Sequence, residues 1–252
     1  MGMILLSVIV GVFIGAIIGL IGSGGSLIAI PALTIFLNQD IVSATTTSAL
    51  IVTLASLTAI VGRPKNHSNL NKAWIFPSIP GIIGAILGGL IFDSVSAILI
   101  YSAISIMMLL AAFLVYKFQN GGYSKTRSTD FQILFILSLT TGFISGLLGI
   151  GGGFLIIPIL MRFGHLSFKV SVSSSQLFVL TNSSVALFTR LQFWSELAWS
   201  EILPLATAAI ITVALFTKWS SDQESKLLVK LFSSTMVFGA CSLILLRVGP
   251  MI

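Results

Sequence analysis

Eight long apolar segments, joined by short polar stretches, dominate the sequence; they run over residues 3–37, 41–62, 73–92, 95–116, 131–163, 170–189, 199–217 and 226–248. A helix needs about 20 apolar residues to cross a bilayer, and six of the segments have about that length. Only 8% of the residues are charged, against about 25% in a soluble domain, so a water-facing surface could not be covered. We predict an all-α, multi-pass bundle surrounded by the lipid bilayer of a cell (plasma or inner) membrane.

The first and fifth segments, with 35 and 33 residues, are too long for one crossing. A continuous helix of the first would reach roughly 52 Å, beyond a hydrocarbon core of about 30 Å. Glycine clusters interrupt both segments, as Gly22-Ser23-Gly24-Gly25 and as Gly149-Ile150-Gly151-Gly152-Gly153. The eight segments therefore predict ten helices when each broken segment is counted as two.

The two glycine clusters belong to an internal repeat. A shift of 127 residues aligns residues 15–31 with 142–158 at nine identical positions of seventeen, and Ser48, Arg63 and Pro77 with Ser175, Arg190 and Pro204. We predict one transmembrane domain over 1–252, built from repeat one (1–118), an inter-repeat loop (119–130) and repeat two (131–252).

The basic residues favour an inverted relation between the repeats. If each broken segment crosses once, the thirteen Lys and Arg residues divide 8 to 5 between the two sides of the membrane. If each turns back at its glycines, they divide 11 to 2, a much stronger positive-inside bias with both termini outside. We expect the inverted arrangement, with the parallel one as the alternative.

The glycine clusters are the first candidate for an anion site. A helix that begins after each break has N–H groups without intrahelical partners, and an anion satisfies such donors at the positive end of the helix dipole. The candidate residues are Gly22, Ser23, Gly24, Gly25, Gly149, Gly151, Gly152 and Gly153. The alternative is that the glycines only permit tight turns and close packing, the role we assign to Gly84 and Gly88.

Small polar residues follow each break and are the second candidate. They are Thr47 and Ser48 in the first repeat, with Ser174, Ser175, Gln176 and Asn182 in the second. Neutral donors can hold an oxyanion less tightly than arginine, which suits a carrier that must release its cargo. Helix capping and interhelical hydrogen bonding are the competing explanation.

The doubled Gly-x-x-Gly-x-Gly-Gly element, each copy followed by a proline and a small-hydroxyl segment, resembles the TauE/SafE family of membrane permeases. The resemblance covers essentially the whole chain. It implies transport of sulfite, organosulfonates or other small anions. Ser26 stands where the second copy has Gly153, so the two halves are not expected to be equivalent.

Charged residues fall at segment ends, which suggests an interior without cations and binding by N–H and hydroxyl groups. The matched pair Arg63 and Arg190 is interpreted either as an electrostatic gate or as juxtamembrane anchoring. Cys241 is the only cysteine, and no Cys/His cluster has metal-ligand spacing, so no metal or cofactor is expected. The basic residues are scattered, which argues against nucleic acid as a partner.

We therefore expect a carrier of small anions, most simply sulfite, organosulfonate or related sulfur oxyanions, that works by alternating access; an anion channel is the alternative. An enzyme is not expected, because Ser23 has no histidine within an apolar segment to act as its base. The chain could assemble as a homo-oligomer.

Overall fold

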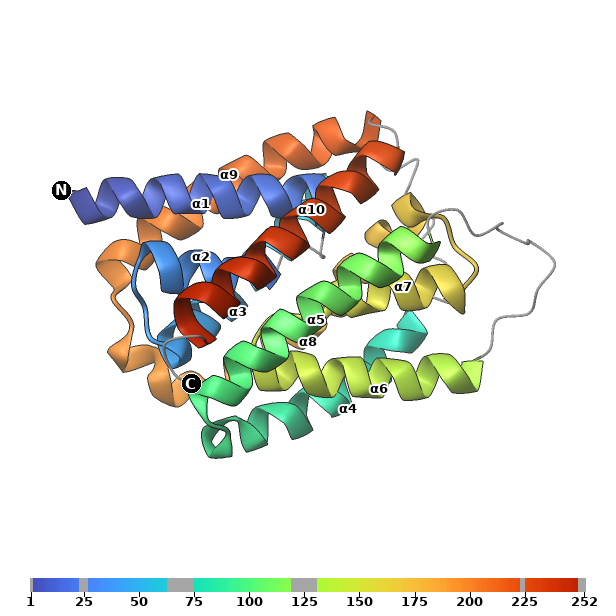
Figure 1. Cartoon of the computed structure of the whole chain (residues 1–252), viewed down its shortest axis with the longest axis horizontal. Helices are drawn as coiled ribbons and strands as arrows, with labels where there is room; N and C mark the ends of the chain where they lie inside the picture. Colours follow the sequence, from blue (N-terminus) through green and yellow to red (C-terminus); the bar gives the residue numbers. More distant parts are fainter. Residues whose placement is uncertain (1, 23–26, 63–74, 119–130, 223–224, 249–252) are drawn as a thin grey trace.

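The fold is an all-helical bundle, seen in a computed structural model that describes residues 2–22, 27–62, 75–118, 131–222 and 225–248 (Figure 1). These residues form ten α-helices: α1 (Gly2–Ile21), α2 (Ala29–Phe36), α3 (Ile41–Gly62), α4 (Ile75–Ile91), α5 (Ala97–Phe118), α6 (Phe131–Leu148), α7 (Gly153–Arg162), α8 (Phe168–Phe188), α9 (Trp199–Asp222) and α10 (Ser225–Leu243). Short 3₁₀ helices η4 (Phe92–Ser94) and η5 (Leu191–Glu196) precede α5 and α9, and the π-helix η6 (Ile244–Val248) follows α10. The predicted all-α fold class is confirmed.

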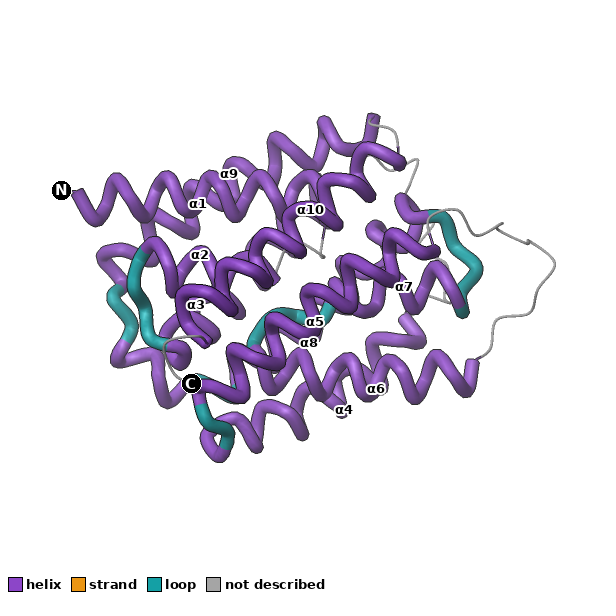
Figure 2. The backbone as a smooth tube through the Cα atoms, in the orientation of Figure 1, coloured by secondary structure: helices purple, strands orange, loops and turns teal. Residues whose placement is uncertain are grey.

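Both overlong segments are broken at their glycines. Positive φ angles of 77°, 71°, 73° and 69° occur at Gly22, Gly149, Gly151 and Gly152, where a side chain would be strained. Figure 2 shows the α6–α7 loop inside the bundle. The helices that follow the breaks, α2 and α7, are short, with eight and ten residues.

Two helix–helix contacts, which we call glycine seams, bring the backbones of neighbouring helices close together because glycines line them. α1 packs along α9, where a Cβ atom on Gly15 would lie 2.5 Å from the Ala209 carbonyl oxygen. α4 packs along α6, where Cβ atoms on Gly84 and Gly88 would collide with the backbone of Leu139 and Phe143. The packing role predicted for Gly84 and Gly88 is confirmed.

Corresponding helices of the two halves of the chain, such as α1 and α6, run in opposite directions. In Figure 1, α1 runs away from the end of the bundle that carries the N-terminus, and α6 runs toward it; α5 and α10 are opposed in the same way. The partners correspond as well, since α1 packs on α9 as α6 packs on α4, while α3 pairs with α8 and α5 with α10. The repeat itself stays a prediction, and this arrangement is what an inverted one requires.

Six helices of the described chain are long and apolar enough to cross a membrane: α1, α3, α5, α6, α9 and the stretch Lys226–Leu246, which joins nearly all of α10 to the start of η6. α4 is too short for this criterion, and α8, although it has 21 residues, is the least hydrophobic of the described α-helices. The protein is therefore a multi-pass membrane protein in which one long helix carries much of the polar character.

Candidate functional site

The two helices that pair at the centre of the bundle, α3 and α8, begin with matched caps. The Asp40 carboxylate accepts hydrogen bonds from the N–H groups of Val42 and Ser43 at 3.0 and 3.1 Å, and the Ser167 hydroxyl accepts from Val170 N at 3.4 Å. Asp40 and Ser167 lie 127 positions apart, at the repeat spacing. Further along, Thr53 Oγ1 donates to Ser183 Oγ at 3.1 Å and joins α3 to α8.

The pKa of Asp40 reflects this cap. Partial burial raises the pKa, but hydrogen bonds from the Ser43 side chain and from the backbone of Ser43 and Val42 outweigh it, and the net pKa lies below the ordinary aspartate value. The carboxylate therefore stays charged at neutral pH and supports the start of α3.

Each glycine break rests on the central helix of the other half of the chain. A Cβ atom on Gly22 would collide with Val172 of α8 and lie 3.2 Å from Gln176 Nε2. A Cβ atom on Gly149 would lie 2.7 Å from the carbonyl oxygen of Thr45 of α3. Because Thr45 and Val172 are also 127 positions apart, the two breaks occupy corresponding places on α3 and α8.

After the turn at Gly149, the loop between α6 and α7 lies at the centre of the bundle. A Cβ atom on Gly151 would lie 2.7 Å from Val179 Cγ1 and 3.1 Å from Val52 Cγ1, two valines that the repeat alignment also matches. Gly152 then caps α7, and its carbonyl oxygen accepts from Leu155 N and Ile156 N. The N–H groups of Gly153 and Phe154 have no acceptor among the described residues, so the start of α7 offers two donors to a ligand.

The predicted hydroxyls divide by repeat. Thr47 and Ser48 on α3 are fully buried, and their hydroxyls have no hydrogen-bond partner among the described residues. In contrast, Ser174 Oγ donates to Val170 O at 2.7 Å, and Ser175 Oγ donates to Val172 O at 2.9 Å. The hydroxyls of Thr47 and Ser48 on α3 therefore have no described partner, while those of Ser174 and Ser175 on α8 bond to their own helix.

The two predicted amides also differ. Gln176 is 1% exposed, and within the described parts of the chain neither Nε2 nor Oε1 has a partner. Asn182 Nδ2 donates to Phe178 O at 2.7 Å, while its Oδ1 is buried without a donor. Gln176 thus presents both a donor and an acceptor, whereas Asn182 presents mainly an acceptor, which does not favour a direct anion contact.

Four predicted residues cannot be placed. Ser23, Gly24, Gly25 and Arg63 lie outside the described residues. The start of the first half-helix and the first of the two arginines are therefore not part of the site described here.

Arg190 corrects the expectation of an interior without cations. Its side chain is fully buried; Nη2 donates to Gly146 O at 2.8 Å and to Leu147 O at 3.0 Å, and Nη1 donates to Ala186 O at 3.1 Å. The guanidinium also lies 4.1 Å from the centre of the Phe92 ring. Juxtamembrane anchoring is therefore wrong for Arg190, because it caps the end of α6 directly before the second break.

Buried serines outside the predicted set also lack partners among the described residues; they are Ser56, Ser78, Ser138, Ser145 and Ser171. Ser145 is the most informative, because a Cβ atom on Gly152 would lie 3.0 Å from its Cβ, at the start of α7. The residue 127 positions earlier, its counterpart in the sequence alignment of the two halves, is Ile18. That difference inside the repeated glycine element is the sequence signal that could have identified it.

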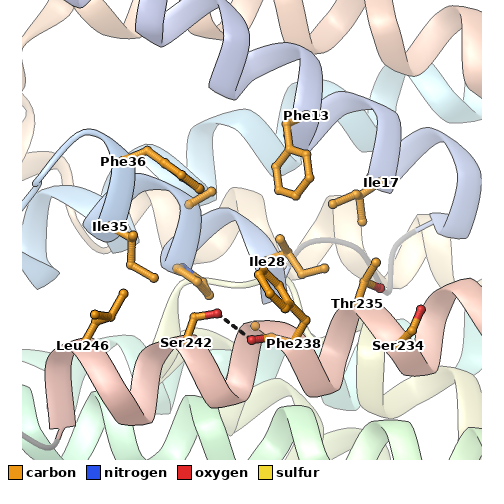
Figure 3. A pocket seen from close by; sticks show the side chains of 13 residues that line it. Phe13, Ile17, Ile28, Ile35, Phe36, Ser234, Thr235, Phe238, Ser242 and Leu246 are labelled. Atoms are coloured by element: carbon orange, nitrogen blue, oxygen red, sulfur yellow. Dashed lines mark hydrogen bonds between the residues drawn. The ribbon is translucent and has the colours of Figure 1, made fainter.

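An apolar cavity of about 530 Å³ lies between α1, α2 and α10 (Figure 3). Phe13, Ile28 and Phe238 are among its lining residues. The hydroxyls there turn back to their own helix, as Ser242 Oγ does to Phe238 O at 2.5 Å. No predicted binding residue lines this cavity, and it offers little to an anion, since burying a charge without partners is costly.

The bundle combines helices of membrane length, helix pairs that run in opposite directions, and two broken helices that meet on the central pair α3 and α8. This is the architecture of a membrane transporter. The comparisons agree with that class. The model of the family described as "Sulfite exporter TauE/SafE" matches residues 7–243. The chain belongs to the TauE/SafE family.

Several curated relatives carry names of the same kind. A "Probable membrane transporter protein" of Methanocaldococcus jannaschii is 29% identical over 62% of this chain and 60% of its own length. "Probable membrane transporter protein YunE" of Bacillus subtilis is 24% identical over 94% of this chain and 96% of its own. A Xylella fastidiosa relative with a similar name is 29% identical over 73% of this chain and 71% of its own. No solved structure matches the chain significantly.

Proposed function

We propose that the protein is a carrier of small anions, with sulfite, organosulfonates or related sulfur oxyanions as its substrates, and that it works by alternating access in the plasma or inner membrane. Membership of the family supports transport as the activity, and the description of the family as sulfite exporters supports the substrate class. The substrate site lies between α3 and α8, at the glycine breaks.

The observation that carries the proposal is the matched placement of the two breaks. Gly22 rests on α8 at Val172, and Gly149 rests on α3 at the equivalent residue Thr45. Since α1 and α6 run in opposite directions, the two turns approach the α3–α8 pair from opposite ends of the bundle. A site shared by two such elements can be exposed to either side by a rocking movement of one repeat against the other.

The donors beside this pair suit an anion. Ser48 and Gln176 offer a hydroxyl and an amide N–H, and the start of α7 offers the N–H groups of Gly153 and Phe154. Arg190 adds positive charge near the second break, because its Nη1 lies 3.3 Å from the position of a Cβ atom on Gly149. Since its three described bonds go to carbonyl oxygens, Arg190 acts on the anion through its field.

Burial favours a carrier over a channel. Ser48 and Asn182 are fully buried and Gln176 is 1% exposed, so the central site is closed to solvent in this structure. A channel needs a continuous open path in its conducting state. A carrier passes through a closed state in every cycle.

Basic side chains support an orientation in the membrane. Helices α5, α7 and α9 end, and α10 begins, at the end of the bundle away from the N-terminus (Figure 1). Near these helix ends the sequence has Lys117, Arg162, Lys218, Lys226 and Lys230. By the positive-inside rule this end faces the cytoplasm, which puts the N-terminus outside.

Transport by purified protein in liposomes tests the proposal. We expect saturable counterflow of labelled sulfite, with competition from organosulfonates and not from small cations. Electrogenic flux that does not saturate with substrate would support the channel instead. Failure to transport any anion of a panel of sulfite, sulfate, thiosulfate, taurine and small carboxylates would refute the function.

A further inference from the structure

The two glycine breaks face different chemical groups. At the first, a Cβ atom on Gly22 would lie 3.2 Å from the amide nitrogen of Gln176. At the second, the same position on Gly149 meets the Thr45 carbonyl oxygen and the Arg190 guanidinium. The repeat counterpart of Gln176 is Ala49, which is fully buried and has no polar side-chain atom. Of the two equivalent positions on the central helices, Ala49 on α3 and Gln176 on α8, only Gln176 therefore carries an amide side chain.

The Gln176 amide is unsatisfied where water does not reach. The side chain is 1% exposed, and neither Nε2 nor Oε1 has a partner among the described residues. Buried polar groups in folded proteins are nearly always hydrogen-bonded, and an orphaned one indicates a function or a missing ligand. A side chain with two N–H donors and one acceptor needs a ligand that can both accept and donate.

We propose that Gln176 is a specificity-determining residue of the transport site, and that it selects anions carrying a hydroxyl or amino donor close to their acidic oxygens. This inference rests on the proposed function. The amide N–H donates to an oxygen of the anion, and Oε1 accepts from the ligand's own O–H or N–H. An anion whose polar atoms are all acceptors leaves Oε1 unsatisfied and facing negative charge, so it binds more weakly.

Because Gln176 lies one turn after Val172, the residue that touches Gly22, the selective contact is made at the first break. The Arg190 field acts from the second break. The two repeats therefore contribute unequally, one through hydrogen-bond selection and the other through charge.

The test uses two anions that differ only in the donor, 2-hydroxyethanesulfonate and ethanesulfonate. In proteoliposomes, wild type is expected to take up the hydroxylated anion with a KM about tenfold lower, the size of one net hydrogen bond. Gln176→Leu, similar in size and without polar atoms, is expected to remove the preference. Gln132→Leu, on an exposed glutamine of α6, is the matched control and keeps the preference.

Two further variants keep the test decisive if Gln176→Leu does not fold. Gln176→Asn retains the amide and is expected to keep a reduced preference, while Gln176→Glu, which adds negative charge, is expected to lose transport of both anions. Equal KM values for the two anions in wild type, or an unchanged preference in Gln176→Leu, overturns the inference and leaves the proposed function intact. Transport of neither anion and of no other anion by wild type would instead remove the proposed function.

Discussion

Replacing Arg190 should weaken the fold more than any exposed arginine can. In Arg190→Met, the carbonyl oxygens of Gly146 and Leu147 lose their guanidinium donor, and each buried unsatisfied group costs about 1–3 kcal/mol. The stacking on Phe92, at 4.1 Å, adds about 2 kcal/mol in a water-poor setting. We therefore expect a loss of at least about 4 kcal/mol in the free energy of unfolding.

Thermal unfolding in detergent, followed by fluorescence-detected size-exclusion chromatography, measures this loss. For a chain of this size about 1 kcal/mol corresponds to roughly 2–4 °C, so Tm should fall by about 8–16 °C. Arg190→Lys keeps the charge but not the planar fork that reaches two carbonyl groups, and it should recover only part of the loss. Arg162→Met, on an exposed arginine at the end of α7, is the control. A Tm for Arg190→Met within experimental error of the control would refute the capping role.

Three further predictions concern the break, the cap and the topology. Gly151→Ala should abolish transport, because φ is 73° and the new Cβ would lie 2.7 Å from Val179, whereas Gly62→Ala, with open space around it, should transport normally in the same liposome assay. Asp40→Ala should lower the free energy of unfolding by about 1 kcal/mol at neutral pH, because the cap of α3 is lost. Folding lowers the pKa of Asp40, so this stabilisation is present above the ordinary aspartate pKa and is lost as the pH falls through the lowered value. The melting curves of variant and wild type should therefore converge in acid and not in base. Lys226→Cys and Glu196→Cys, each in a Cys241→Ser background, test the orientation with the N-terminus outside. An impermeant thiol reagent should label Lys226→Cys only from the cytoplasmic side and Glu196→Cys only from outside. The reverse pattern would contradict this orientation.

The fold was largely predictable from the sequence, because bilayer thickness limits helix length. Segments 3–37 and 131–163 had to break, and their glycine clusters were the places best suited to it. The glycine pair Gly84 and Gly88 was predictable for the same kind of reason, since close backbone approach requires the absence of a Cβ atom.

The state of each polar side chain was not predictable. Ser48 and Ser175 are matched in sequence, yet only Ser175 has a described bond from its hydroxyl to its own helix, a choice of rotamer that depends on local packing. Arg190 stood at the end of an apolar segment and was therefore expected near the membrane surface. Its burial follows from the end of α6, whose free carbonyl oxygens lie within reach of the guanidinium.

The glycine seams also decide what can fold on its own. Helix α1, in the first half of the chain, packs on α9 in the second half, and α6, in the second half, packs on α4 in the first. Neither half therefore contains the partner of its own first helix. A chain cut between residues 118 and 131 would yield two fragments that are each incomplete but mutually complementary, so co-expression of both, and not of either alone, should restore a stable protein.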